Sequence, residues 1–377
     1  MRFAFVDVED PEDVTTWSGI PYFLLRELRR QGVDVEVIAP LKRPFKYLFT
    51  PHKVVSEITH SSLQINRHPI ALGGFAAQVE RRIRGKKFDA IFSTSSIPVA
   101  YLKPGISVLY WTDAVTEAME DYYGSFSKIS QRELRIAHHQ EQAALNRASF
   151  AVYASNWAAS AVNKFYKTSS GKVQVIEFGA NLPIDHDQGE IVAFNRQRLQ
   201  SQCVLLFIGV DWERKGGACA FEAAKLLNEQ GIKTVLKVVG CNGPDSPFVE
   251  NFGFINKNTP EGQLQIKKLL ATSTFLILPT RAEAAGIVFC EAAAFGLPTL
   301  ATRTGGVQSY VIDSVTGYCL SVEANGRAYA DLIAASLASP DTYCRLSLEA
   351  FRRYKQTLNW QVGVSSLLNL VARANQS

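Results

Sequence analysis

The stretch FLILPTRAEAAGIVFCEAAAFGLPTLAT, residues 275 to 302, places a longer apolar segment between two short ones. The short runs FLILP (275–279) and PTLAT (298–302) have the length and composition of strands, and the segment between them has the length of a helix. Gly296 and Pro298 mark the end of that helix. The order strand, helix, strand predicts a parallel sheet with helices packed against it.

The same alternation runs along the whole chain and predicts an α/β protein with two doubly wound domains that meet at a cleft. A chain of 377 residues is too long for one ordinary core. The segment 178–190 is rich in Gly, Pro and Asp and is the best linker. We therefore expect an N-terminal domain over 1–182 and a C-terminal domain over 190–357.

The predicted strands matter because ligands of open α/β sheets bind beyond the carboxyl ends of the strands. In the first domain the predicted strands are 2–8, 33–40, 62–67, 89–95, 106–112, 150–155 and 172–178. In the second they are 203–210, 233–240, 251–255, 275–279, 298–302 and 317–320. The loops that follow these strands are where a site is expected.

Composition excludes several classes of protein. A hydrophobic content of 47% with 20% charged residues is that of a soluble globular chain. The N-terminus lacks the apolar core of a signal peptide, and no apolar run approaches the roughly 18 residues of a membrane span. The six cysteines form no Cys-x-x-Cys pair, which indicates reduced thiols in a cytoplasmic protein rather than disulfides or a zinc site.

Several functional motifs are also missing. No strand is followed by Gly-x-Gly-x-x-Gly, and there is no P-loop, which argues against a dehydrogenase and a P-loop enzyme. His138 and His139 are an isolated pair on a polar helix. The basic residues lack the aromatic interleaving of a nucleic-acid groove, so we expect no nucleic-acid partner. No acidic cluster matches a metal-dependent transferase, so we expect no metal.

The candidate site is a set of charged residues in the loops of the second domain. Glu283 lies in the loop before the predicted helix and Glu291 a little over one turn into it. The first-turn N–H groups of that helix, at Gly286, Ile287 and Val288, form an anion site. Carboxylates accept hydrogen bonds from sugar hydroxyls, whereas phosphates bind amides, Arg and Lys.

Two cations, Arg214 and Lys215, precede Gly216-Gly217 at the start of another helix. The macrodipole disfavours cations there, so an anionic ligand explains their place more easily. Together these groups suit a ligand with both hydroxyls and phosphates, such as a nucleotide sugar. Spacing alone leaves open that one glutamate is a surface residue and the other a satisfied helix carboxylate.

Glu283, the seven residues before Glu291, and Gly296-Leu297-Pro298 resemble the Glu-x7-Glu signature of retaining glycosyltransferases of family 4, also called group 1. LLFIGVDWERKGG (205–217), FLILPTRAE (275–283) and ATRTGG (301–306) resemble other segments of that family. The match runs from about 203 to 320; the first half matches only in pattern. The resemblance implies the GT-B fold, with two Rossmann-like domains. It places the nucleotide sugar on the C-terminal domain and the acceptor on the N-terminal one, against which a last helix (about 358–377) packs.

The resemblance also implies roles for residues. Glu291 would hold the ribose hydroxyls, Glu283 the donor sugar, and Arg214 and Lys215 the diphosphate. The remaining implied donor-site residues are Gly286, Ile287 and Val288 near the phosphates, Gly253, Phe254 and Ile255 along the base, and the Ser18-Gly19 loop. Many relatives carry a histidine after the N-domain strand where this chain has Asp113. Asp113 is therefore expected to bind a sugar hydroxyl or to orient the acceptor.

The function implied is retaining, metal-independent transfer of a hexose. The donor is a nucleotide-diphosphate sugar bound as substrate, with no cofactor, and the acceptor is a glycan or a lipid-linked molecule in envelope or exopolysaccharide biosynthesis. Two alternatives stay open, a sugar-nucleotide epimerase of the same fold and a non-catalytic sugar-binding protein.

The first half of the chain carries a basic region between Arg26 and Lys87, with thirteen Lys and Arg against five Asp and Glu. It includes LKRPFKYLF (41–49), in which Lys42, Arg43 and Lys46 alternate with aromatic and apolar residues. Such a segment suits an anionic membrane surface, which predicts peripheral binding at the inner membrane face. The alternative is that its apolar residues pack on the domain while the cations face water.

Overall fold

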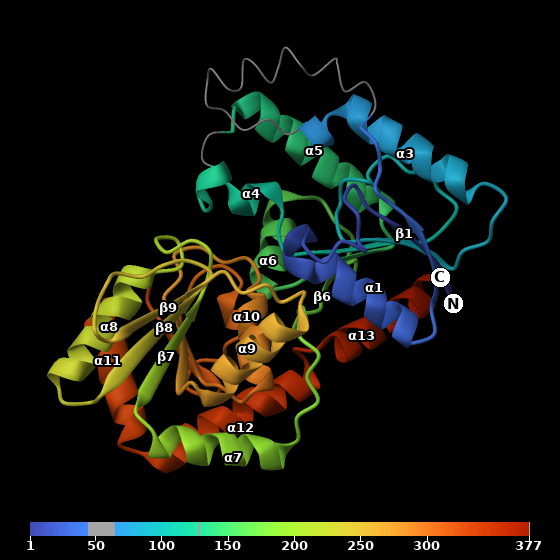
Figure 1. The fold of residues 1–377 in the computed structure, drawn as a ribbon. Helices are drawn as coiled ribbons and strands as arrows, with labels where there is room; N and C mark the ends of the chain where they lie inside the picture. Colours follow the sequence, from blue (N-terminus) through green and yellow to red (C-terminus); the bar gives the residue numbers. More distant parts are fainter. Residues whose placement is uncertain (44–64, 127–128, 377) are drawn as a thin grey trace. The chain divides into compact units, whose positions relative to one another are not determined.

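The computed structural model describes residues 1–43, 65–126 and 129–376, and these divide into two compact units. The first unit comprises Met1–Ile176 and Gly363–Ser377, and the second comprises Glu177–Val362. Each unit has one parallel six-stranded sheet with helices on both faces (Figure 1). This is the doubly wound α/β architecture that the alternation of strands and helices predicts.

The sheet of the first unit has the strand order β2-β1-β3-β4-β5-β6, and all its neighbours pair in parallel. Its four central strands are mostly apolar and buried because both faces are covered, and Phe3 to Val6, for example, are fully buried, whereas the two edge strands also carry polar residues and are only partly buried. The strands are β1 (Arg2–Val6), β2 (Asp34–Ile38), β3 (Ala90–Ser93), β4 (Val108–Thr112), β5 (Phe150–Tyr153) and β6 (Val173–Val175).

The helices of the first unit follow the strands as crossovers. They are α1 (Ile20–Arg30), α3 (Pro69–Ile83), α4 (Thr116–Met119), α5 (Gln131–Arg147) and α6 (Asn156–Phe165), joined by most of α13 (Trp360–Ala374) from the end of the chain. Side chains alternate across β1: Ala4 and Val6 pack in the cluster that includes α3, α5 and α6. The opposite face carries α1 and α13 (Figure 1), and Ser365 of α13 hydrogen-bonds Gln31, just after α1, at 3.0 Å.

The sheet of the second unit has the order β12-β11-β10-β7-β8-β9, also all parallel. Its strands are β7 (Cys203–Ile208), β8 (Thr234–Val239), β9 (Val249–Gly253), β10 (Phe275–Leu278), β11 (Thr299–Thr302) and β12 (Gly317–Leu320). Every strand predicted for this half of the chain is present. The order brings β10 beside β7, so the loops after these two strands emerge next to each other.

The helices of the second unit are α7 (Gln188–Gln200), α8 (Gly217–Glu229), α9 (Pro260–Thr272), α10 (Ile287–Ala294), α11 (Gly326–Leu337) and α12 (Pro340–Gln356). Helix α8 packs with α11, whereas α7, α9, α10 and α12 contact one another, and the two groups cover opposite faces of the sheet (Figure 1). As predicted, α10 starts after Gly286 and stops before Gly296, whose φ of +53° ends the helix in the left-handed conformation.

One predicted strand is wrong. Residues 62–64 lie outside the described residues, and Ile65–Arg67 form a 3-10 turn rather than part of a strand at 62–67. The His68 N–H closes this turn on the Ile65 carbonyl at 3.2 Å, and the His68 side chain caps α3. Pro69 is the first residue of α3, where its fixed φ favours the helix. Local helix-start signals therefore outweigh the short alternation of apolar and polar residues.

The predicted linker, 178–190, contains no strand, and α7 begins inside it at Gln188. The linker is not a loose tether, because Phe178 and Asn181 are buried in the second unit. The Trp360 indole N–H donates to the Asn181 side-chain oxygen at 2.8 Å, and the two rings of Phe178 and Trp360 lie 5.7 Å apart. This segment therefore contributes to the second core.

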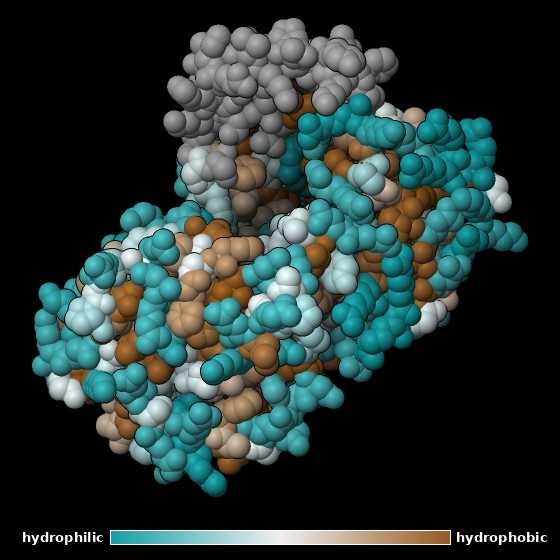
Figure 2. All heavy atoms as spheres, viewed as in Figure 1, coloured by the Kyte–Doolittle hydropathy of each residue, from teal (hydrophilic) through white to brown (hydrophobic). Residues whose placement is uncertain are grey.

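The six cysteines are free thiols. The face of the molecule seen in Figure 2 is largely hydrophilic, with smaller hydrophobic areas between the polar residues. Within the described residues, no helix combines the length and the apolar composition that crossing a membrane requires.

Candidate active site

The loops after β7 and β10 form the centre of the candidate site, and they bring together two residues that are 68 positions apart. Lys215 stands in the loop between β7 and α8, and Glu283 in the loop between β10 and α10. Their side chains form an ion pair in which the lysine is 12% and the glutamate 9% exposed. This pair is a cation and a carboxylate at the carboxyl edge of the sheet, where the sequence predicts the site.

Arg214 joins the same two loops. Its guanidinium donates to the Ala282 carbonyl at 2.9 Å and lies 3.4 Å from the Asp211 carboxylate. Its own carbonyl accepts a hydrogen bond from the Arg281 N–H at 2.8 Å. Arg214 therefore both fixes the loop that carries Glu283 and places a partly exposed cation beside it.

Gly216 and Gly217 have a packing role that the sequence analysis missed. A Cβ on Gly216 would lie 1.9 Å from the Pro279 carbonyl oxygen, and its φ is +77°. A Cβ on Gly217 would lie 2.1 Å from the Trp212 ring. Gly216 allows the loop after β7 to approach the end of β10, and Gly217 allows Trp212 of its own loop to pack against the start of α8, so the two glycines do not by themselves indicate an anionic ligand.

Glu291 lies in α10 and is fully buried. One carboxylate oxygen, Oε1, is 2.6 Å from the ammonium group of Lys257. The other, Oε2, is buried and accepts no hydrogen bond from the described part of the chain. Buried polar atoms nearly always have a partner, so an unpartnered carboxylate oxygen indicates that a donor group is missing.

Lys257 is a residue that the sequence analysis did not single out. It lies between β9 and α9, so it too follows a strand at the carboxyl edge of the sheet. Its side chain is 33% exposed. The signal that could have found it is its position after the NFGFI run, although a lone lysine in such a loop has no distinctive spacing.

The residues predicted to line a base lie on the same segment but differ in exposure. Gly253 ends β9 with a φ of +60°, and the Phe254 side chain is 76% exposed. Ile255 is buried and packs inward. Val210, after β7, is 71% exposed, so this edge carries two exposed apolar side chains. An exposed aromatic ring is suited to stacking on a planar ligand.

Asp113, Ser18 and Gly19 belong to the first unit. Asp113 directly follows β4 and is half-buried. Ser18 is exposed and Gly19 buried, in the turn that leads into α1, and three successive residues there have left-handed φ values: Trp17 at 42°, Ser18 at 57° and Gly19 at 83°. Such backbone conformations are strained for non-glycine residues and concentrate at functional loops.

Another carboxylate of the first unit, Asp7, was not predicted. It follows β1 and is buried; its Oδ2 accepts the Thr94 hydroxyl and its Oδ1 the Val8 N–H at 2.7 Å. Burial is the largest effect and raises the pKa of Asp7 to about 6. Asp7 and Thr94 follow adjacent strands, β1 and β3, at the same edge of the sheet as Asp113.

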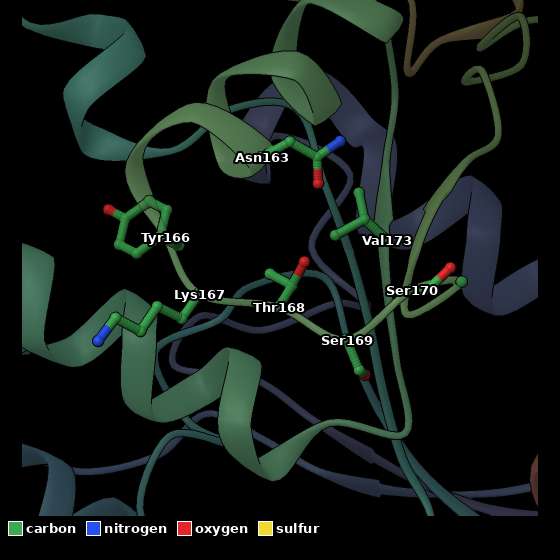
Figure 3. Close-up of a pocket in the computed structure, with 8 residues that line it drawn as sticks. Asn163, Tyr166, Lys167, Thr168, Ser169, Ser170 and Val173 are labelled. Carbon is green, nitrogen blue, oxygen red and sulfur yellow. The ribbon is translucent and has the colours of Figure 1, made fainter.

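A polar cavity of about 590 Å³ lies elsewhere on the first unit, around the turn between α6 and β6. Figure 3 shows the side chains of Asn163, Thr168 and Val173 around its centre, with Tyr166 and Lys167 at one side. Because this turn precedes β6, it lies at the amino edge of the sheet, opposite Asp7 and Asp113. None of the predicted site residues lines it, and we place the candidate site by charge and burial rather than by cavity volume.

Two matches to known families cover most of the chain. Residues 193–353 match the family described as glycosyl transferases group 1, and residues 22–182 match glycosyltransferase family 4. The chain belongs to the group 1 glycosyltransferases. The resemblance carried by the two glutamates is thereby confirmed, and the protein is an enzyme that transfers a sugar.

This glycosyltransferase is similar to curated relatives over different lengths. It is 22% identical over 376 residues to the D-inositol 3-phosphate glycosyltransferase of Corynebacterium urealyticum, with 91% of this chain and 87% of the relative covered. It is 35% identical over 122 residues to the lipopolysaccharide glucosyltransferase WaaG of Escherichia coli, with 31% and 33% covered.

Solved structures establish the fold of this glycosyltransferase. Sucrose-phosphate synthase (tll1590) from Thermosynechococcus elongatus superposes with a TM-score of 0.68 at 16% identity, covering 99% of this chain and 98% of that one. Anabaena Alr3699/HepE in complex with UDP superposes with a TM-score of 0.65 at 15% identity, covering 99% and 100%. The expected GT-B fold, with two Rossmann-like domains, is confirmed.

Proposed function

We propose that this glycosyltransferase transfers a hexose, with retention of anomeric configuration, from a nucleotide-diphosphate sugar to a glycan or lipid-linked acceptor. The observation that carries the donor assignment is the presence of two cation–carboxylate pairs, Lys215 with Glu283 and Lys257 with Glu291, on segments that follow strands of one sheet. A nucleotide sugar has hydroxyl groups for the carboxylates and phosphates for the cations. UDP-glucose, the ligand in another HepE structure, is a nucleotide sugar.

The chemistry assigned to these residues follows from where charge develops. As the glycosidic bond to the phosphate breaks, negative charge grows on the leaving diphosphate and positive charge on the anomeric carbon. Arg214, Lys215 and the first-turn N–H groups of α10 at Gly286, Ile287 and Val288 would stabilise the diphosphate. Glu283 would hold the donor sugar, and Asp113, in the first unit, would bind a sugar hydroxyl or orient the acceptor.

We propose that side-chain cations perform the neutralisation that a metal ion supplies in other transferases. The support is the pair Arg214-Lys215 in the loop after β7. Turnover that survives exhaustive chelation by EDTA is the expected result. Loss of turnover in EDTA that Mg²⁺ or Mn²⁺ restores would refute this part of the proposal.

The donor assignment is tested by thermal shift with a panel of nucleotide-diphosphate sugars, because a ligand of the folded state raises the melting temperature. A labelled donor that binds is then incubated with and without an acceptor lysate. Transfer only with the lysate is the expected result. An isomerised or hydrolysed donor without lysate would favour the epimerase, and binding without any product would favour the sugar-binding protein. The anomeric configuration of the product decides between retention and inversion.

The proposal also includes a binding partner besides the acceptor, namely an anionic membrane surface at the inner face of the membrane. Its support is the basic region, in which Lys42 and Arg43 are exposed; Lys46 and the aromatic residues at 45, 47 and 49 lie outside the described residues. Flotation with anionic vesicles at low salt tests it. If binding is absent, or survives replacement of all three cations by Glu, a soluble glycan is the better acceptor. The WaaG relative, named as a lipopolysaccharide glucosyltransferase, supports an acceptor from envelope polysaccharide biosynthesis.

A further inference from the structure

The pair between Lys257 and Glu291 joins parts of the second unit that are distant in the sheet. Lys257 follows the edge strand β9, whereas α10 follows β10, and β7 and β8 lie between these strands. The lysine nonetheless reaches to 2.6 Å from Glu291 Oε1. Lys257 and Glu291 therefore contact each other because of the paths of the loops, and not because they are close in the sequence.

We propose that Lys257 is a positioning residue of the donor site. Its ammonium group pairs with Glu291 Oε1 and turns the carboxylate so that Oε2 is left for a hydroxyl group of the donor nucleotide. The inference rests on the proposed function, in which Glu291 binds the vicinal hydroxyls of a ribose. It assigns to Lys257 a role that acts through Glu291 rather than through direct contact with the reacting atoms.

The need for a counter-ion follows from burial. Glu291 has no solvent exposure, and a carboxylate in such a place takes up a proton unless a cation or several donors stabilise its charge. Ionisation matters for binding because a carboxylate accepts hydrogen bonds at both oxygens, whereas a protonated carboxyl presents a donor at one of them. A ribose offers two adjacent hydroxyl donors and therefore requires the ionised form.

The neighbouring groups do not replace Lys257 in this task. Cys290 precedes Glu291 on α10, and burial raises the pKa of its thiol well above the usual range, so it remains neutral. Its Sγ donates to the Phe178 carbonyl at 3.2 Å. The other charged groups that act on this thiol, Glu177 and Arg353, lie 3.4 Å from each other. Among the residues that the structure describes, Lys257 is the cation within hydrogen-bond distance of Glu291.

The first arm of the test needs no ligand. The folding stability of wild type, Lys257→Met, Lys257→Arg and the double variant Lys257→Met with Glu291→Gln is measured from about pH 5 to pH 9. Lys257→Met leaves the buried Glu291 carboxylate without its counter-ion, and an unpaired buried charge is costly, so the folded variant should favour the neutral carboxyl group. Relative to wild type, the folding equilibrium constant of Lys257→Met should then fall as pH rises over this range, by at most tenfold for each pH unit.

The double variant should lose this added pH dependence, because the carboxylate is gone, and Lys257→Arg should follow wild type. If Lys257→Met alone does not fold at pH 8, recovery at pH 6 or in the double variant gives the same answer. A Lys257→Met variant whose stability parallels wild type across the range overturns the proposal.

The second arm uses uridine diphosphate as the probe, with guanosine and adenosine diphosphates in parallel, by calorimetry at about pH 6 and 8.5. Lys257→Met should bind the recognised nucleotide roughly ten- to a hundredfold more weakly than wild type at the lower pH, with the gap narrowing at the higher pH. Lys257→Arg and the control Lys268→Met, an exposed lysine on α9, should bind like wild type.

The outcomes separate the two hypotheses. If wild type binds none of the three nucleotides, the proposed donor class fails and the positioning role fails with it, whatever the stability arm shows. If wild type binds one and Lys257→Met binds it equally well at both pH values, the proposed function stands and the positioning role is overturned.

Discussion

Replacement of Arg198 by Met should destabilise the second unit more than any exposed substitution on the same helix. Arg198 lies on α7 and is only 1% exposed. Its guanidinium donates to the carbonyls of Leu270 and Ala271, in the last turn of α9, at 2.9 and 3.0 Å. It also donates to the carbonyls of Phe295 and Gly296, after α10, both at 3.0 Å. One cation thus satisfies the ends of two helices whose dipoles place negative charge there.

The magnitude follows from the groups left behind. Methionine fills much of the space but donates no hydrogen bond, so the carbonyls of Leu270, Ala271 and Phe295 lose their side-chain donor, whereas the Gly296 carbonyl keeps the Ser347 hydroxyl at 2.5 Å. At about 1 kcal/mol for each of these three carbonyls, the low end of the range for an unsatisfied group because water can enter, the loss is about 3 kcal/mol. Burial of the guanidinium lowers its pKa, because a buried cation loses its hydration. Replacement by Met removes this desolvation cost and so offsets part of the predicted loss of stability.

Urea unfolding followed by circular dichroism measures the effect, and with a slope of about 2.5 kcal/mol/M the midpoint of the affected transition should fall by about 1.2 M. Arg196→Met, an exposed position on the same helix, is the matched control and should stay within about 0.5 kcal/mol of wild type. If the unfolding free energy of Arg198→Met stays within about 1 kcal/mol of wild type, the carbonyls of Leu270, Ala271 and Phe295 do not depend on this residue and the reasoning is wrong.

Three further predictions concern other parts of the chain. Lys215→Ala should lower turnover at subsaturating donor roughly ten- to a hundredfold without unfolding the protein, and near-normal turnover would contradict the donor site. Because the pKa of Asp7 is raised to about 6, the stability that its protonated form contributes is fully present below about pH 4 and is lost as pH rises past 6. The stability of Asp7→Asn relative to wild type should therefore increase between about pH 4 and 7, by on the order of 3 kcal/mol, as measured in urea titrations. Gly216→Ala should destabilise the protein by at least about 2 kcal/mol more than Gly231→Ala. Both glycines have φ near +80°, but only at Gly216 would the new Cβ meet a backbone atom, the Pro279 carbonyl oxygen at 1.9 Å. Equal effects of the two substitutions would show that the loops can move apart.

The sequence predicts the strands of the second unit well because each is a short apolar run bounded by turn residues, as in FLILP at 275–279. It fails at 62–67, where helix-start signals at His68 and Pro69 compete with a short alternation. The sequence also predicts that the side chains directly after the strands lie at the same edge of the sheet, because the carboxyl ends of parallel strands share that edge.

Their partners are not predictable in the same way. Glu283 and Glu291 are recognisable from their spacing, but the lysines that they contact, Lys215 and Lys257, lie 68 and 34 residues away. Which cation meets which carboxylate depends on strand order and loop path, which no local pattern encodes. The glycines Gly216 and Gly217 show the reverse case, a local signal with a packing cause that only the structure reveals.

The return of the chain to the first unit has a consequence for synthesis on the ribosome. Residues from Gly363 onward belong to the first unit, and Val364, Leu367 and Val371 of α13 are buried there. Asn375 hydrogen-bonds Ser107 at 2.9 Å and the Asp89 carbonyl at 3.1 Å. The second unit is thus an insertion, and its whole length leaves the exit tunnel before the helix that completes the first. Once residues up to 362 have left the tunnel, the second unit should be folded, while the face of the first sheet that α1 and α13 share is still only partly covered and open to a chaperone.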